Sequence, residues 1–135
     1  MRKLLLPIVA LTALGCVSSK DSSPPGLDSA VVQHSKATRA WNLRSQGVAV
    51  GSVIRYESVL GPDRFYFIVR NRHEQDMGLV DALGRAYRNR PFEDEPEWLG
   101  SGTVLDGARL ILGLGGAVEL DETVIGAAFG ASSPP

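Results

Sequence analysis

Two short clusters of acidic and histidine side chains have the residue types of a metal site. The first is His73-Glu74-Gln75-Asp76, and the only other histidine, His34, lies far away in the sequence. A zinc site needs three or four ligands, which consecutive loop residues rarely supply alone. The second, Glu93-Asp94-Glu95-x-Glu97, lacks the alternating spacing and internal glycine of a calcium-binding loop. Both clusters are therefore predicted to be solvated polar loops, and no metal or other cofactor is predicted.

The same residue types give no indication of an enzyme. Serine catalysis needs a histidine base, which would have to be His73, and the chain has no Gly-x-Ser-x-Gly turn. Gly100-Ser101-Gly102 precedes a predicted helix but lacks the lysine and the glycine spacing of a phosphate-binding loop. We therefore predict a non-catalytic protein.

The one cysteine of the chain, Cys16, follows a short apolar segment. Met1-Arg2-Lys3 supplies positive charge, and Leu4–Leu14 is an apolar run of eleven residues. This is the layout of an export signal. The run has about half of the roughly twenty residues that a helix needs to span a bilayer. Residues 1–15 are therefore predicted to be a signal peptide that is removed.

The four residues Ala13-Leu14-Gly15-Cys16 resemble the lipobox of bacterial lipoproteins. Gly15 and Cys16 match the family pattern, whereas Ala13 and Leu14 depart from its commonest choices. The resemblance implies that Cys16 becomes the lipidated N-terminus, with a diacylglyceryl group on its sulfur and an acyl group on its nitrogen. More than one acyl chain gives a durable membrane anchor. Val17, where an aspartate often retains such proteins at the inner membrane, implies the outer membrane and a periplasm-facing domain.

An ordinary secreted protein is the alternative at the same cleavage site. Ala13-x-Gly15 also satisfies the small-x-small pattern of ordinary signal peptidase cleavage. The two alternatives differ in the fate of the Cys16 sulfur, which is acylated in one case and free in the other.

After the cysteine, the sequence predicts a tether and one small domain. Residues 16–37 are rich in serine and proline with few large apolar side chains, a composition that cannot offset chain entropy by burial. Residues 38–126 are predicted to form a single soluble domain, and residues 127–135 a disordered tail. With one cysteine in the chain, no intramolecular disulfide is predicted.

Two β-hairpins are predicted in the first half of this domain. Residues 47–56 and 65–69 are the strands of the first, with the turn at Gly61-Pro62-Asp63-Arg64. Residues 78–80 and 85–88 are the strands of the second. Apolar alternation is expected to place side chains of the first hairpin on shared faces, with Val48, Val50, Ile54 and Tyr56 on one face and Phe65, Phe67 and Val69 in the core.

A helix and a further strand are predicted in the second half. Thr103 can cap a helix that runs to Leu112, with Asp106 in its first turn and Gly113 as its stop. Its apolar stripe is Val104, Leu105, Ala108, Ile111 and Leu112. Residues 117–120 are predicted to be a strand. The fold class is therefore α+β: a small antiparallel β-sheet domain with one amphipathic helix.

An immunoglobulin-like β-sandwich with a helical connection is the alternative fold. Within residues 65–87, Leu79-Val80-Asp81-x-x-Gly84-Arg85-x-Tyr87 follows an apolar strand. This pattern resembles small immunoglobulin-like domains of bacterial lipoproteins.

Charge is unevenly distributed along the domain. Residues 39–91 contain nine arginines and five acids, a net of +4, and residues 92–135 contain one arginine and eight acids, a net of −7. The two halves are expected to neutralise each other within one fold. An exposed surface for an anionic envelope polymer or lipid headgroup is the alternative. The slightly acidic total gives no indication of nucleic-acid binding.

Tryptophan and arginine are the usual anchors of a protein interface. The predicted interface residues are Trp41, Arg39, Arg44, Arg70, Arg72, Arg85 and Arg88. Of the two tryptophans, Trp41 is expected to be the more exposed. The sequence thus predicts a lipoprotein whose domain binds or stabilises another component of the cell envelope, with a protein partner favoured over an anionic one.

Overall fold

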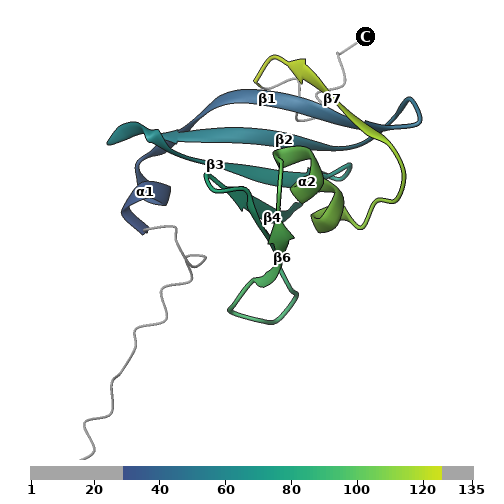
Figure 1. Ribbon diagram of the computed structural model, residues 1–135. Coiled ribbons are helices and arrows are strands. Elements are labelled where there is room, and N and C mark those ends of the chain that lie inside the picture. The colour runs from purple at the N-terminus through teal and green to yellow at the C-terminus, as the bar shows by residue number, and fades with distance from the viewer. Residues whose placement is uncertain (1–28, 126–135) are drawn as a thin grey trace, which may run out of the picture.

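Antiparallel pairing joins seven strands into one curved sheet, and a helix packs against one of its faces (Figure 1). The computed structural model describes residues 29–125. The strands are β1 (Ser35–Ser45), β2 (Val48–Ser58), β3 (Gly61–Asn71), β4 (Asp76–Asp81), β5 (Arg85–Arg88), β6 (Glu97–Ser101) and β7 (Val118–Thr123). The helices are α1 (Ser29–Gln33) and α2 (Val104–Leu112). The predicted small antiparallel sheet with an amphipathic helix is confirmed.

The strand order shows how the sheet is built. It is β6-β5-β4-β3-β2-β1-β7, so six consecutive strands form a meander. The chain leaves the edge strand β6, passes through α2 and returns at the opposite edge, where β7 pairs with β1. α2 therefore connects the two edges of the sheet and lies across the face between them.

The folded part begins earlier than residue 38. α1 starts at Ser29 and β1 at Ser35, both inside the predicted tether. Val31 of α1 is only 8% exposed and packs with three apolar side chains of the sheet, Tyr66, Leu79 and Tyr87. The composition of residues 16–37 as a whole concealed this short apolar contact. Cys16 and residues 1–28, like the predicted tail at 127–135, lie outside the described residues.

The first hairpin forms as predicted, but its turn is displaced. The chain reverses at residues 59–60, where the Ser58 hydroxyl accepts from the Leu60 backbone N–H at 3.1 Å. Ser58 pairs with Gly61, whereas Glu57 pairs with Phe65, so the intervening residues bulge out of β3. The predicted turn at Gly61-Pro62-Asp63-Arg64 therefore forms a bulge in β3, because the chain has already reversed in a shorter turn just before it.

A second bulge, in β2, changes which of its side chains share a face of the sheet. Leu43 pairs with Gly51 and Arg44 with Ala49, which leaves Val50 as the extra residue. Val50 consequently packs against the helix-side core, whereas Ile54 is buried on the opposite face of the sheet. The expected single face of Val48, Val50, Ile54 and Tyr56 is therefore wrong. The faces of β3 are confirmed, since Phe67 and Val69 belong to the helix-side core with Phe65 packed against it.

The second hairpin has the predicted turn chemistry. Asp81 accepts hydrogen bonds from the backbone N–H groups of Leu83 (3.0 Å) and Arg85 (2.9 Å). Gly84 has a φ of 79°, the left-handed conformation that glycine adopts without strain. This hairpin places β4 and β5 under α2.

The helix-side core consists of buried side chains from α2 and from every strand except β6, whose Leu99 packs against it as a partly buried residue. Its buried members are Leu43, Val53, Phe67, Val69, Val80, Ala86, Ala108, Ile111 and Val118. Thr103 and Asp106 form a reciprocal capping box at the start of α2, and Gly113 ends the helix with a φ of 65°. The predicted helix, its cap and its stop are confirmed. The apolar stripe of α2 faces the core as predicted.

Gly107 allows the closest approach of α2 to the sheet. A Cβ at this position would lie 2.6 Å from Cγ2 of the buried Val80 and 3.3 Å from Cβ of Ala86. The glycine that weakens the helix by propensity is therefore required by packing.

Replacement of Gly107 by alanine is predicted to destabilise the protein by about 1–3 kcal/mol, because overpacking outweighs the gain in helix propensity. Gly115→Ala is the matched control, since a Cβ there meets nothing within 4 Å, and it should change stability by less than about 0.5 kcal/mol. Denaturant unfolding of both variants checks the difference. Equal stability of Gly107→Ala and the parent chain would contradict the close-contact account.

Candidate interaction surface

The predicted interface residues do not form one patch. β1 carries Arg39, Trp41 and Arg44, the β3–β4 region carries Arg70 and Arg72, and β5 carries Arg85 and Arg88. Cys16, the predicted lipidation site, lies outside the described residues. What each arginine can bind is determined by the partners that it already has.

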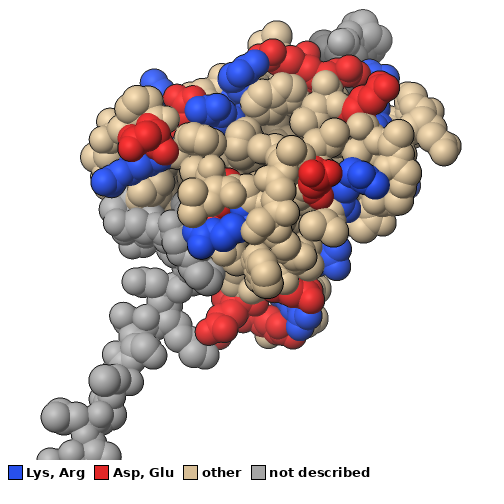
Figure 2. Space-filling model, viewed as in Figure 1, with Lys and Arg blue, Asp and Glu red and all other residues tan. Residues whose placement is uncertain are grey.

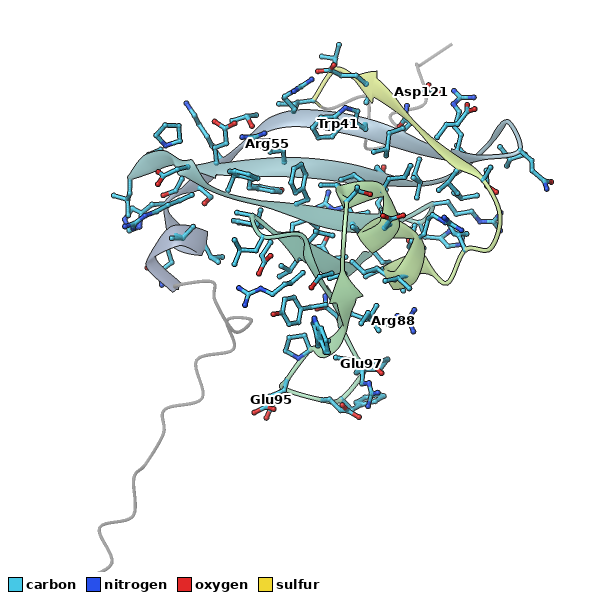
Figure 3. All side chains as sticks on the ribbon, viewed as in Figure 1. Trp41, Arg55, Arg88, Glu95, Glu97 and Asp121 are labelled. Atoms are coloured by element: carbon cyan, nitrogen blue, oxygen red, sulfur yellow. The ribbon has the colours of Figure 1, made fainter. Side chains whose placement is uncertain are left out.

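Trp41 is half-buried in a layered group of aromatic and arginine side chains on the helix side of the sheet (Figure 3). Its ring lies 6.0 Å from that of Phe67, and the Arg39 guanidinium lies 5.0 Å from the Trp41 ring centroid. Arg55 lies 4.2 Å above the ring of Phe65. Its Nε is 2.9 Å from Glu57 Oε1, an ion-pair distance without hydrogen-bond geometry. Trp41 thus packs against the helix-side core as a partly buried residue.

Acidic side chains of β7 neutralise the arginines of β1. Arg39 donates through Nε and Nη2 to the two carboxylate oxygens of Glu122, each at 2.9 Å, and Arg44 Nε lies 2.8 Å from Asp121 Oδ2. Figure 2 shows such blue and red side chains next to one another over the upper part of the molecule. Along this edge, the expected neutralisation of the basic half by the acidic half is confirmed.

Arg70, Arg85 and Arg88 are held by neighbouring groups. Arg70 forms an ion pair with Asp76, and Arg85 Nε donates to Oδ2 of the buried Asp81 at 2.6 Å. Arg88 Nε donates to the carbonyl of Ile111 at 3.0 Å and Nη2 donates to that of Leu110. Arg88 therefore caps carbonyls in the last turn of α2, where a cation is favoured. Arg72 is exposed in the loop after β3. Arg70, Arg85 and Arg88 therefore stabilise the fold locally.

The exposed tryptophan is Trp98 on the edge strand β6. It is 63% exposed, so the prediction that Trp41 is the more exposed tryptophan is wrong. Trp98 pairs with Tyr87 of β5, and Leu99 is an extra residue that bulges toward the helix-side core. The sequence signal was the position of Trp98 two residues after Pro96, the end of the proline-flanked acidic segment, where a loop ends and a strand begins.

The loop between β5 and β6 adds a second aromatic side chain and most of the local charge. Phe92 is fully exposed and has a φ of 64°, a left-handed conformation that is unfavourable for a bulky residue. Arg90 forms ion pairs with Glu93 and Glu97, and Figure 3 places Glu95 at the far end of the loop. Residues 90–97 contain one arginine and four acids, a net of −3.

Neither predicted polar cluster forms a metal site within residues 29–125, where no group of three or more metal-ligating side chains converges. The loop at His73 is organised by Asn71, whose Oδ1 accepts from the backbone N–H groups of His73 (2.9 Å) and Gln75 (3.1 Å). An open pocket of about 260 Å³ lies against α2, lined by Asp106, Arg109, Leu110 and Leu114. It brings together no nucleophile and base.

No known protein family, curated protein or solved structure matches the chain. Within residues 29–125, no helix is long and apolar enough to cross a membrane.

The Arg39–Glu122 pair gives a prediction that can be measured directly. The Arg39 hydrogen bonds hold the pKa of Glu122 below its ordinary value, and Arg90 does the same for Glu97. Arg39→Ala is predicted to raise the Glu122 pKa toward the ordinary value and to leave that of Glu97 lowered. Because the folded-state pKa is lowered, any stabilisation is present above the unfolded-state pKa and is lost as pH falls through the folded one.

Carboxyl NMR titration of the parent chain and of Arg39→Ala checks this. An unchanged Glu122 pKa in the variant would show that the ion pair does not form in solution.

Proposed function

We propose that this chain is a non-catalytic cell-envelope lipoprotein, anchored by acylated Cys16, whose small periplasm-facing domain binds or stabilises another envelope protein. The observation that supports the docking role best is the 63% exposure of Trp98 on an edge strand. Large aromatic side chains that remain exposed are typical anchors of protein interfaces.

The anchor rests on the N-terminal residues. The apolar run that ends in Ala13-Leu14-Gly15-Cys16 resembles a lipoprotein signal. Residues 17–28 separate Cys16 from α1 and span at most about 40 Å when fully extended. Acylation of Cys16 would therefore keep the domain close to the membrane surface and concentrate it near envelope partners.

A non-catalytic role is supported by the arrangement of the reactive side chains. His73 is exposed in a loop, and no nucleophile contacts it among the interactions of the described residues. The pocket against α2 pairs Asp106 and Arg109 with two leucines. Neither place has the nucleophile, base and orienting group that acyl transfer needs.

The alternative, a binding module for an anionic envelope polymer or lipid headgroup, has less support. Five of the predicted interface arginines, Arg39, Arg44, Arg70, Arg85 and Arg88, already have carboxylates or helix carbonyls as partners. An anionic ligand would have to displace those groups. The exposed β5–β6 loop is acidic and would repel it.

We also infer the finer fold class. The six-strand meander β1–β6 is continuous with β7 in one sheet, and α2 covers one of its faces. This arrangement favours the α+β class over an immunoglobulin-like sandwich, which packs two sheets face to face.

The anchor is tested by intact mass and membrane partitioning of the protein made in a Gram-negative host, beside Cys16→Ala. The proposal predicts that the parent chain lacks residues 1–15, gains diacylglyceryl and acyl mass and pellets with membranes. The variant should lose both properties. Val17→Asp is the localisation control and should keep the lipid but shift the protein toward the inner membrane. A soluble, unmodified parent chain would overturn the anchor.

A further inference from the structure

β6 is one of the two edge strands of the described sheet, and its outer side pairs with no other strand. We propose that β6 receives an extended, basic segment of a partner protein, which pairs with it as an eighth strand and places an apolar side chain beside Trp98. This inference rests on the proposed docking role and specifies the surface and the chemistry of the partner.

The two sheet edges differ in how they are protected. β7 carries three exposed acids, Glu119, Asp121 and Glu122, and the last two form ion pairs with arginines of β1. Charged side chains on an edge discourage pairing with another strand. β6 carries one acid, Glu97, which is paired with Arg90, and otherwise presents Trp98, Gly100 and Ser101; the described residues place no strand on its outer side. Strand addition to such an edge satisfies backbone groups that are otherwise left to water.

Trp98 also ends an apolar row that crosses the sheet. Cα pairing runs through the six strands of the meander as Ala40, Ile54, Ile68, Leu79, Tyr87 and Trp98. Ala40 and Ile54 are fully buried, Leu79 is 9% exposed and Tyr87 4%, but Trp98 is 63% exposed. The row is therefore incomplete at one end. A seventh member, supplied by an added strand, would cover the outer side of Trp98.

Charge determines which segment fits. Residues 90–97 carry a net of −3, and Figure 2 shows their acidic side chains gathered at the lower end of the molecule. Lysine or arginine side chains on an added strand would be attracted to this loop. The fully exposed Phe92 offers them an aromatic ring in the same loop.

The same charge argues against two other occupants. A second copy of this chain pairing β6 with β6 would present Glu97 and no lysine or arginine from its strand, so the charge of the acidic loop would stay uncompensated. An anionic membrane surface would be repelled by the loop. A basic, extended protein segment with alternating apolar side chains is the occupant that satisfies the edge, the row and the charge together.

The test uses the protein in the form that cells produce, in detergent if it carries lipid, and a short peptide of alternating lysine and valine as the probe. Calorimetric titration is predicted to show binding that weakens as salt is raised. A peptide of alternating glutamate and valine should not bind. A lysine–valine peptide with proline at its centre, which cannot form the strand ladder, should bind at least about tenfold more weakly.

Variants locate the site. Trp98→Ala is predicted to weaken binding at least about tenfold, and Val48→Ala, which alters a 61% exposed apolar side chain on β2, should not. Glu95→Lys should weaken binding several-fold, whereas Glu119→Lys at the opposite edge is its control. Because Trp98 is largely exposed, its variant should unfold at the same denaturant concentration as the parent chain, which separates lost binding from lost folding.

Amide hydrogen exchange distinguishes strand addition from surface adhesion. The bound peptide is predicted to slow exchange in residues 97–101 and to leave the β7 amides unchanged. Absence of binding up to about 1 mM peptide, equal binding by Trp98→Ala, or protection at β7 would each overturn the inference. Those results leave the lipid anchor untouched, because mass and partitioning test the anchor independently.

Discussion

The contact between α2 and the sheet is the constraint on which the rest of the structure depends. A nine-residue helix covers the core of a seven-stranded sheet, so it has to lie very close to the strands. Gly107 permits this on the helix, against Val80, and Gly78 permits it on β4, where a Cβ would lie 3.1 Å from Ile111 Cγ2. Arg88 then holds the last turn of α2 against β5 through helix carbonyls. The close approach brings Ala108 and Ile111 into the core.

This architecture also determines which parts of the surface remain available. α2 connects β6 to β7 across the helix-side face, so these consecutive strands form opposite edges of the sheet. The two edges therefore have different neighbours. The β7 edge is charged and paired with arginines of β1, whereas the β6 edge presents Trp98 beside an acidic loop. Most arginines that sequence reasoning assigned to binding are used to stabilise strand pairs, a turn and a helix end. The β6 edge is therefore the surface that we propose for docking.

Sequence patterns predicted the parts of the fold in which local chemistry decides the outcome. The α2 cap at Thr103, its stop at Gly113 and the Asp81–Gly84 turn are set by residues within a few positions of one another. β1 and β6 were missed because they are stabilised by neighbouring strands that are distant in sequence and contain few apolar residues in alternation. The faces of β2 were mispredicted because strict alternation does not anticipate the bulge at Val50. The exposure of Trp98 could not be derived for a similar reason: it depends on which strand ends the sheet.

We propose that the docking role of the β6 edge operates in the cell. It is tested most directly by placing a photoreactive amino acid at position 98 in living cells and sequencing the crosslinked peptides, with position 48 as the comparison. The account predicts that position 98 crosslinks to one extended, basic segment of an envelope protein and that position 48 does not. Crosslinks from position 98 only to lipid, to a second copy of this chain or to acidic segments would contradict it, as would equal crosslinking from both positions.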